Sequence, residues 1–351
     1  MNLIRKAFAL DPLISISMVC LMLLSLFVLN SITPEIFPIY YLYIIISIII
    51  FLLFLKIDFD IYLLFSNHLY IFCIFLLILP LIIGQISRGA IRWIPIGPVT
   101  IQPSEIVRPF LILFFAKYLT AEELNLVRIV KAIVLVVIPI ILILIQPSLG
   151  VALITGIALI GVYLASGINK KILIVTFLVI ILVSPGLWLL LAPYQKQRVL
   201  SFVDPGSDPQ GAGYNSIQSM ISVGSGRFFG RGLGKGVQTQ LQFLPEKHTD
   251  FIFAAVSEEL GFIGASLLLI LLFVLYWRIS RIIELSKGRI SRAFVAGILL
   301  AFFVETIIHI GMNMKLLPIT GVPLPFVSAG GSALMASMIS LSMVLKAKKV
   351  R

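Results

Sequence analysis

Asp250 is the acidic residue best placed for chemistry, in the segment PEKHTDFIFAAVSEELG at residues 245–261. The stretch from Asp250 to Trp277 would span about 42 Å as a helix, at 1.5 Å per residue, which exceeds the roughly 30 Å hydrocarbon core of a membrane. We therefore expect the carboxylate at the height of the lipid headgroups, beside Lys247 and His248. Two interpretations stay open: a catalytic carboxylate, or an acid that stabilises the start of a helix through the helix dipole.

Two further sets of charged residues fall inside apolar segments. Glu105 and Arg108 are three positions apart and share a helix face. Charges at membrane depth are costly and usually face a bundle interior or an aqueous cavity, so this pair either supports a site or fixes helix packing. Glu305 and His309, four positions apart, favour a buried structural hydrogen bond.

The adjacent acids Glu258 and Glu259 lie two helical turns beyond Asp250. Neighbouring residues on a helix cannot both face the same partner. One of the two is therefore expected to line a cavity while the other packs elsewhere.

A glycine-rich basic run, GSGRFFGRGLGKG, occupies residues 224–236 and carries Arg227, Arg231 and Lys235. Its spacing matches neither the P-loop nor GxGxxG, so no nucleotide cofactor is predicted. Backbone N–H groups and cations in such a run can approach an anionic headgroup or a pyrophosphate; a flexible basic loop is the alternative. The sequence has neither zinc-ligand spacing nor a serine nucleophile elbow.

The composition determines what kind of chain must position these residues. Of 351 residues, 60% are apolar and 12% are charged, against about 25% charged in a soluble domain. These values exclude a soluble globular protein, a disordered protein and a nucleic-acid binder, and the long apolar runs exclude a transmembrane β-barrel. We predict an all-α polytopic membrane protein that forms a single domain over 1–351. Cys20 and Cys73 lie in apolar runs and are expected to be small core residues.

Ten transmembrane helices are predicted from runs of about 20 apolar residues. One run of 38 residues, Ala132–Asn169, is divided into two spans by a turn at Gln146–Gly150. The other eight spans are Leu13–Pro34, Ile36–Leu55, Ile61–Ser87, Pro103–Leu119, Ile172–Leu191, Phe251–Tyr276, Ala293–Met312 and Phe326–Leu345.

The distribution of lysine and arginine predicts the orientation. With both termini in the cytoplasm, 17 of the 27 basic residues fall in cytoplasmic segments, as the positive-inside rule requires. The start of the chain has no cleavage-site pattern and is interpreted as an uncleaved first helix. One long extracytoplasmic loop, about 192–249, then joins the seventh and eighth spans. Two shorter external segments, 84–102 and 313–325, indicate a site that opens outward.

Four segments of the chain resemble the SEDS proteins (shape, elongation, division and sporulation) of the RodA/FtsW type, and RodA more than FtsW. They are GAIRWIPIG with QPSE (89–97 and 102–105), FVDPGSDPQGAGYNSIQSMISVGSGRFFGRGLGKG (202–236), LPEKHTDFIFAAVSEELG (244–261) and PITGVPLPFVSAGGSAL (318–334). Two positions depart from the family pattern: Arg108 replaces a lysine, and Ala329 replaces the tyrosine of SYGGS.

The resemblance implies a peptidoglycan glycosyltransferase that polymerises lipid II at the outer face of a bacterial inner membrane, for cell-wall elongation and rod shape. It implies a class B penicillin-binding protein as the transpeptidase partner, together with other proteins of an elongation complex. By motif, the essential aspartate of the family falls on Asp250 and the glutamate of QPSE on Glu105. The remaining predicted substrate-binding or supporting residues are Arg108, Trp93, Arg198, Arg227, Arg231, Lys235, Lys247, His248, Glu258, Ser328 and Ser332.

This chemistry needs one base and one source of positive charge. Forming a β-1,4 bond from an α-linked pyrophosphate donor inverts the donor carbon, so a base must deprotonate the acceptor hydroxyl while cations stabilise the departing pyrophosphate. Asp250 fits the first task; basic residues or a divalent cation, Mg²⁺ or Mn²⁺, fit the second. A lipid II flippase or transporter and a non-catalytic scaffold of a cell-wall synthase are the alternatives. The concentration of charge near the outer boundary favours catalysis.

Overall fold

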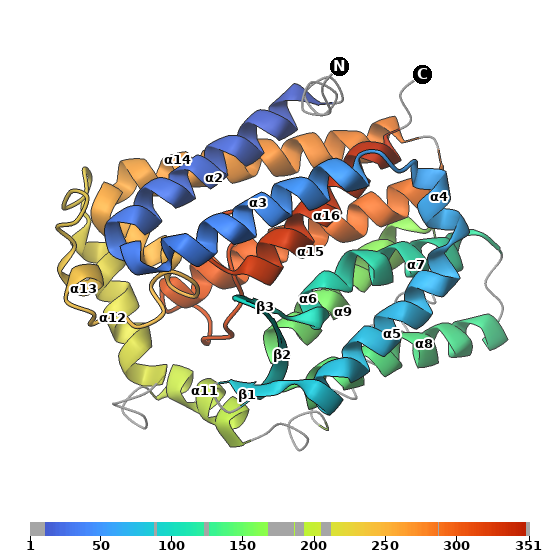
Figure 1. Ribbon diagram of the computed structural model, residues 1–351, viewed down its shortest axis with the longest axis horizontal. Helices are drawn as coiled ribbons and strands as arrows, with labels where there is room; N and C mark the ends of the chain where they lie inside the picture. Colours follow the sequence, from blue (N-terminus) through green and yellow to red (C-terminus); the bar gives the residue numbers. More distant parts are fainter. Residues whose placement is uncertain are drawn as a thin grey trace.

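The structure of the protein is a computed structural model that describes residues 11–87, 90–122, 126–167, 186, 193–204, 212–286 and 288–348. Apolar helices dominate these residues, which confirms the predicted all-α membrane fold (Figure 1). The first half contains α2 (Pro12–Ile32), η1 (Pro34–Ile36), α3 (Phe37–Phe54), α4 (Phe59–Leu64), α5 (Ser66–Ile83), α6 (Pro103–Ile106), α7 (Arg108–Thr120), α8 (Leu126–Ile145) and α9 (Leu149–Ala165). The second half contains α11 (Pro193–Val203), α12 (Ala212–Ser225), α13 (Val237–Gln240), α14 (Ile252–Leu285), α15 (Arg289–Asn313) and α16 (Gly331–Ala347).

Six of the described helices are long and apolar enough to cross a membrane, and α9 and α16 are shorter apolar helices. Proline stands in the first turn of α2, α3, α6 and α7, where its missing N–H removes no helical hydrogen bond. The predicted turn at 146–150 is confirmed, because α8 ends at Ile145 and α9 begins at Leu149. The predicted seventh span, 172–191, lies outside the described residues except for position 186, so the count of ten spans stays a prediction.

Two external segments contain regular structure that the sequence analysis did not predict. Three strands form a small antiparallel sheet: β1 (Gln85–Ser87), β2 (Ala90–Ile96) and β3 (Val99–Ile101). The predicted third span therefore ends at Ile83 instead of Ser87. The predicted long loop contains α11, α12 and α13; in Figure 1, α12 and α13 lie at one end of the bundle, on the left.

The two ends of the described chain meet near the C-terminal end of α14, whereas α12 and α13 lie near its N-terminal end. Asp11, which caps α2, forms ion pairs with Arg278 of α14 (2.7 Å) and with Lys348 just after α16 (3.4 Å). The first and last described residues, Asp11 and Lys348, therefore lie at the same end of the bundle.

Gly261 divides α14 into two parts. Its backbone leaves the helical conformation (φ 65°, ψ −160°), which favours glycine because a side chain at positive φ is strained. The chain around Gly230 crosses α14 at this break, so closely that a Cβ on Gly230 would lie 2.1 Å from the carbonyl oxygen of Glu259. The break in the helix and the glycine-rich run therefore form one packed unit.

Candidate active site

The backbone around Asp250 is fixed on every side. The N–H of Asp250 donates to the carbonyl of Glu246 (3.1 Å), and its carbonyl accepts from Nδ2 of Asn313 (3.0 Å). The hydroxyl of Ser328 donates to the carbonyl of Thr249 (2.8 Å). The carbonyl of His248 accepts from the N–H of residue 329 (2.9 Å). The segment after α15 therefore holds residues 248–250 in one position.

Asn313 is the residue that sequence reasoning missed. Its side chain is fully buried and joins α14 to α15: Nδ2 also donates to the carbonyl of His309 (2.7 Å), and Oδ1 accepts from the N–H of Ala254 in the first turn of α14 (3.0 Å). The N-cap residue of α14 is Phe251, which provides no side-chain cap. Asn313 thus satisfies a backbone N–H at the start of α14, as an N-cap side chain does.

Gly321 is where two predicted site residues come together. A Cβ on Gly321 would lie 3.5 Å from Oδ2 of Asp250 and 3.8 Å from Nη1 of Arg198, and its φ is +71°. Arg198 belongs to α11, and its Nη1 donates to the carbonyl of Ile319 (3.5 Å). The carboxylate and the guanidinium therefore converge on one loop of backbone, although their residues are 52 positions apart in the sequence.

A buried group of three charges lies deeper in the bundle. Arg108 forms a 2.6 Å ion pair with Glu105 and a second ion pair with Glu305 of α15. All three side chains are 5% exposed or less. The spacing of Glu305 and His309 suggested a hydrogen bond between them, and this prediction is wrong. Nδ1 of His309 instead contacts the carbonyl of Val322 (2.8 Å).

One face of α15 connects this group of charges to Asp250. Glu305, His309 and Asn313 follow one another at intervals of four residues, which places them on one side of the helix over about 12 Å. Glu305 holds Arg108, His309 holds the backbone beside Gly321, and Asn313 holds Asp250. The structure therefore relates Glu105 and Arg108 to Asp250 through α15.

Glu258 and Glu259 both hold the external segment in place. The two oxygens of Glu258 accept the N–H groups of Gln238 (2.9 Å) and Thr239 (3.0 Å) in α13. Oε1 of Glu259 accepts from Ser31 (2.9 Å), from the N–H of Gly234 (3.0 Å) and from Gln240 (3.2 Å). Both carboxylates are fully buried, and both position the external segment. The expectation that one of them lines a cavity while the other packs elsewhere is therefore wrong.

Several predicted supporting residues also have internal contacts. Nζ of Lys247 donates to the carbonyl of Thr239, and burial lowers the pKa of this lysine although nearby glutamates oppose the shift. The hydroxyl of Ser332 accepts the N–H of Gln102 (2.8 Å), joining QPSE to α16. Trp93 lies in β2, paired with Gln85 of β1. By contrast, Arg227, Arg231 and Lys235 are exposed.

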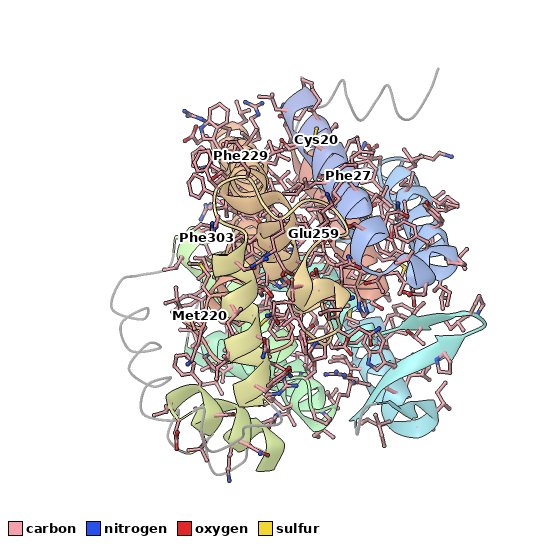
Figure 2. The ribbon with its side chains drawn as sticks, turned by 90° about the vertical axis from the view of Figure 1, so that its left-hand side faces the viewer. Cys20, Phe27, Met220, Phe229, Glu259 and Phe303 are labelled. Atoms are coloured by element: carbon pink, nitrogen blue, oxygen red, sulfur yellow. The ribbon has the colours of Figure 1, made fainter. Side chains whose placement is uncertain are left out.

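An apolar groove of about 1130 Å³ lies along α14 and α15. Among the described residues it is lined by α9, α14 and α15, from Trp277 and Phe303 to Gly311 and Leu317. Leu317, in the lining of the groove, precedes Gly321 by four residues in the sequence. Figure 2 shows the molecule from the end that carries α12 and α13, with Phe303 labelled.

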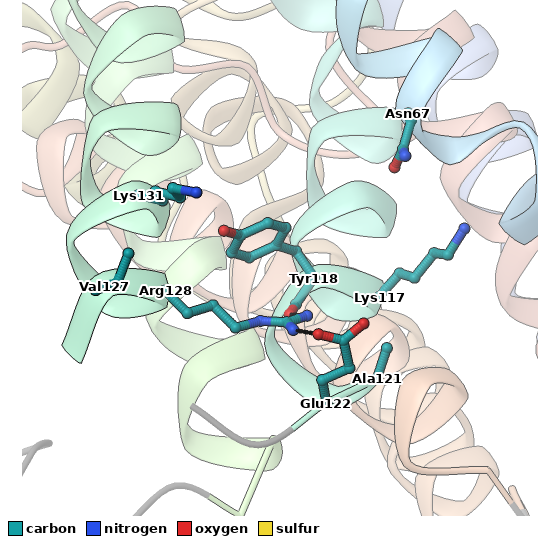
Figure 3. A pocket seen from close by; sticks show the side chains of 8 residues that line it. All are labelled: Asn67, Lys117, Tyr118, Ala121, Glu122, Val127, Arg128 and Lys131. Atoms are coloured by element: carbon teal, nitrogen blue, oxygen red, sulfur yellow. Dashed lines mark hydrogen bonds and ion pairs between the residues drawn. The ribbon is translucent and has the colours of Figure 1, made fainter. Parts of the chain in front are cut away.

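A second hollow, of about 450 Å³, is separate from these residues. It lies where α7 ends and α8 begins, and Figure 3 shows Arg128 in it, paired with Glu122. The guanidinium carbon of Arg128 lies 4.9 Å from the centre of the Tyr118 ring. Arg108 begins α7 and this hollow lies at its last turn. The hollow is thus about a helix length from the Arg108 ion pairs and is not part of the candidate site.

Comparison with known proteins establishes the family. A family model described as "Cell cycle protein", covering FtsW, RodA and SpoVE, matches residues 6–351. The chain belongs to the FtsW/RodA/SpoVE family. The peptidoglycan glycosyltransferase MrdB of Escherichia coli (strain K12) is 40% identical over 283 residues, which cover 80% of this chain and 76% of MrdB.

Solved structures agree with the fold of this FtsW/RodA/SpoVE protein. A chain from a peptidoglycan synthase complex that coordinates polymerization and crosslinking superposes with a TM-score of 0.80, at 27% identity and 95% coverage of both chains. RodA of Thermus thermophilus gives a TM-score of 0.72 at 22% identity and 98% coverage of both chains. The second similarity shows the fold alone.

The two departures from the FtsW/RodA/SpoVE pattern have different consequences here. The planar guanidinium of Arg108 has five N–H donors and bonds to Glu105 through one nitrogen and to Glu305 through another. The lysine typical of the family would offer a single ammonium to both acids. At Ala329, the backbone N–H donates to the carbonyl of His248. This hydrogen bond needs no aromatic ring at position 329.

Among the described residues of this FtsW/RodA/SpoVE protein, no three or more His, Cys, Asp or Glu side chains are grouped to hold a metal ion. Near Gly321 the chain supplies the carboxylate of Asp250 beside a cation, Arg198. This donor set does not fit a site for Mg²⁺ or Mn²⁺ made by the protein alone.

Proposed function

We propose that this protein is a peptidoglycan glycosyltransferase that polymerises lipid II. Membership in the family and 40% identity to MrdB support this activity. The observation that carries the proposal is Asp250, whose backbone is held by Asn313 and whose carboxylate converges with Arg198 on Gly321. Gly321 follows Leu317, which lines an apolar groove, by four residues. A catalytic base beside a groove for a prenyl chain is what a polymerase of lipid-linked sugars requires.

In the proposed reaction Asp250 acts as the general base. Its carboxylate accepts the proton of the acceptor sugar's 4-hydroxyl while that oxygen attacks the anomeric carbon of the donor. The new bond is β-1,4, the bond from the anomeric carbon to the pyrophosphate oxygen breaks, and undecaprenyl pyrophosphate leaves with the electron pair. The hydrogen bonds to the backbone of Asp250 support this step, because they limit the positions that the base can take and so reduce the reorganisation that the reaction requires.

Arg198 is proposed to act on the acceptor side. In an inverting transfer the base and the leaving group lie on opposite faces of the reacting carbon, and Arg198 approaches the same point as Asp250. Its guanidinium can therefore orient the acceptor or its phosphates. The groove between α14 and α15 offers an apolar path for a prenyl chain.

We propose further that the end carrying Asp250 faces the outside of the cell and that both termini lie in the cytoplasm. The proximity of Asp11 and Lys348 at the other end of the bundle supports this arrangement. A class B penicillin-binding protein is the proposed partner, since the solved complex to which this chain is similar joins polymerization to crosslinking. Other proteins of an elongation complex, and Mg²⁺ or Mn²⁺ as cofactor, stay predictions.

The decisive test is Asp250→Asn in purified protein with its penicillin-binding partner, measured by polymerisation of labelled lipid II. Losing a general base costs about 10²–10⁴-fold in rate, and we expect a loss of this size. Asn313 already satisfies the first turn of α14, so the substitution is not expected to unfold that helix. Co-purification of the partner is the control for assembly. Polymerisation at nearly the wild-type rate would exclude Asp250 as the base.

Transport is distinguished from polymerisation by the same preparation. A flippase would move lipid II between leaflets without forming glycan, and a scaffold would leave Asp250 dispensable. The intramembrane charges of Arg108, Glu105 and Glu305 are paired with one another, which favours a structural role for them over a transport path.

A further inference from the structure

Three phenylalanine side chains gather on the surface where the glycine-rich run crosses the break in α14. Phe228 stacks on Phe262 (ring centroids 5.7 Å apart) and meets Phe229 edge to face (5.0 Å). Phe228 is 55% exposed, Phe262 is 62% exposed and Phe229 is 78% exposed. We call them the phenyl cluster; Figure 2 labels Phe229 beside α14. An exposed aromatic cluster of this kind marks an interaction surface.

The backbone holds the phenyl cluster rigidly against α14. Because Gly261 leaves the helical conformation, the N–H groups of Phe262 and Ile263 are available, and they donate to the carbonyls of Arg227 (2.9 Å) and Phe228 (3.3 Å). On the other side, the N–H of Arg231 donates to the carbonyl of Glu258 (2.9 Å). The backbone that carries the rings is thus fixed, and it has little conformational entropy left to lose on binding.

The position of the cluster along α14 sets its depth in a membrane. From Phe262 to Trp277 the helix advances about 22 Å, within a hydrocarbon core of about 30 Å. Trp277 lies near Arg278 and Arg281 (5.6 and 5.9 Å), an aromatic residue with cations that is typical of a membrane boundary. The exposed side of α14 in between is apolar, for example at Ile270 and Phe273. The phenyl cluster therefore extends a lipid-facing surface to the opposite boundary.

Two arginines flank the cluster in the sequence. Arg227 and Arg231 are exposed, and within the described part of the chain their side chains form no hydrogen bond or ion pair. The nearest acids in the packed unit, Glu258 and Glu259, are buried and directed at α13 and Gly234. The surface beside the rings is therefore cationic, and each such residue near a membrane favours anionic lipid by about 1 kcal/mol, or about fivefold.

We propose that Arg227–Phe229, with Phe262 and Arg231, is an anchor that binds anionic phospholipid in the outer leaflet. The rings enter the upper acyl-chain region, and the guanidinium groups bind the lipid phosphates above it. Depth, continuity with the lipid-facing side of α14 and charge all select a lipid partner. The anchor would hold the external segment, and through Glu258 also α13, at a constant height above the bilayer.

Spin-label depth measurements test the position of the rings. In a Cys20→Ser, Cys73→Ser background, a label is placed by Phe229→Cys in phosphatidylcholine bilayers with and without phosphatidylglycerol. Glu35→Cys, in the linker between α2 and α3, reports water, and Phe273→Cys, at 69% exposure on α14, reports hydrocarbon. We expect label 229 to contact oxygen more than a water-soluble nickel chelate, as label 273 does. Contact with the chelate as strong as at position 35 would overturn the proposal.

A charge variant tests the headgroup contact. Arg227→Gln with Arg231→Gln should abolish the deepening of label 229 that phosphatidylglycerol produces, with an anionic-lipid preference lower by about fivefold per arginine. An unchanged response to phosphatidylglycerol would contradict the proposal. So would protection of label 229 that occurs only after the penicillin-binding partner is added, because it would assign the cluster to a protein interface. These readouts do not involve polymerisation, so they are independent of the proposed activity.

Discussion

Gly321 leaves room for two side chains that the mechanism needs. A Cβ there would lie 3.5 Å from Asp250 and 3.8 Å from Arg198, at a φ of +71°. Both distances are ordinary van der Waals contacts, so alanine acts here through its strained φ, which shifts the loop that Asp250 and Arg198 contact. We expect Gly321→Ala to lower polymerisation by about 10²-fold, because a misplacement of about 1 Å is enough for a loss of that size. The measurement is the initial rate of lipid II polymerisation by the complex with its partner.

Gly97→Ala is the matched control for backbone strain. Gly97 also has a positive φ (+61°), in the turn between β2 and β3, but no atom lies within 4 Å of its Cβ position. Alanine is strained at both positions, but only at position 321 does its Cβ contact Asp250 and Arg198. Equal rates for the two variants would show that the space beside Asp250 is not important.

Sequence reasoning found the charged members of the site and missed the residue that connects them. Asp250 and Arg198 were predicted, and the structure brings both to Gly321. Asn313 gave no signal, because a lone amide between two methionines has no pattern of its own. Its three partners, at 250, 254 and 309, are revealed only when α14 and α15 are packed together.

At the scale of elements, the start of α14 depends on α15. Asn313→Asp keeps the size of the side chain and the acceptor for Ala254, but it replaces the donor to Asp250 and His309 with an oxygen. We expect kcat to fall by about tenfold or more with a smaller change in KM, since a positioning residue acts on the base. A variant with wild-type kcat would show that Asn313 serves packing alone.

The contact between α7 and α15 depends on Arg108. Arg108→Met would leave two buried carboxylates without a cation, and we expect it to lower the free energy of unfolding by about 3–5 kcal/mol. The triple variant Glu105→Gln, Arg108→Met, Glu305→Gln removes all three charges and should recover most of that loss. Denaturation in detergent measures both. A triple variant as unstable as Arg108→Met would contradict this account of the ion pairs.

Element boundaries were predictable where local chemistry determines them. The Gln146–Gly150 turn follows from its proline and glycine, and α8 and α9 end and begin around it. The sheet and the helices of the external segment were missed. The three strands pair with one another locally, but β3 is also held by a distant residue, Tyr43, whose hydroxyl accepts the N–H of Thr100 (2.7 Å). The first turn of α13 likewise donates to the carboxylate of Glu258, about 20 residues away in the sequence.

At the scale of the whole molecule, Asp11 joins the first described helix to α14 and to the end of α16. Burial alone would raise the pKa of Asp11, but the hydrogen bond and charge of Arg278 and the charge of Lys348 lower it overall. A carboxyl group whose pKa is lowered by folding stabilises the protein above its unfolded pKa, and this contribution is lost as the pH falls through the folded pKa. The pH window therefore lies below about 4.

We expect Asp11→Asn to lower the melting temperature at neutral pH and to reduce its dependence on pH below about 4. Asparagine caps a helix as well as aspartate does, so the change removes charge and not the cap. Asp58→Asn is the control, because Asp58 pairs with Lys346 at 74% exposure, and exposed pairs contribute little. Equal effects of the two substitutions would contradict the importance of burial.

The contacts between the N-terminal helices and α16 also determine when the protein can finish folding. Ser25 donates to the carbonyl of Val327 (2.5 Å), and the ring of Tyr43 fills the space beside Gly331. These partners are about 300 residues apart, which a ribosome covers in roughly 15–60 s at 5–20 residues per second. During that interval α2 and α3 must stay in the bilayer with their final neighbours not yet made. Biogenesis of this protein therefore includes an interval in which α2 and α3 contact lipid or the insertion machinery in place of their final packing partners.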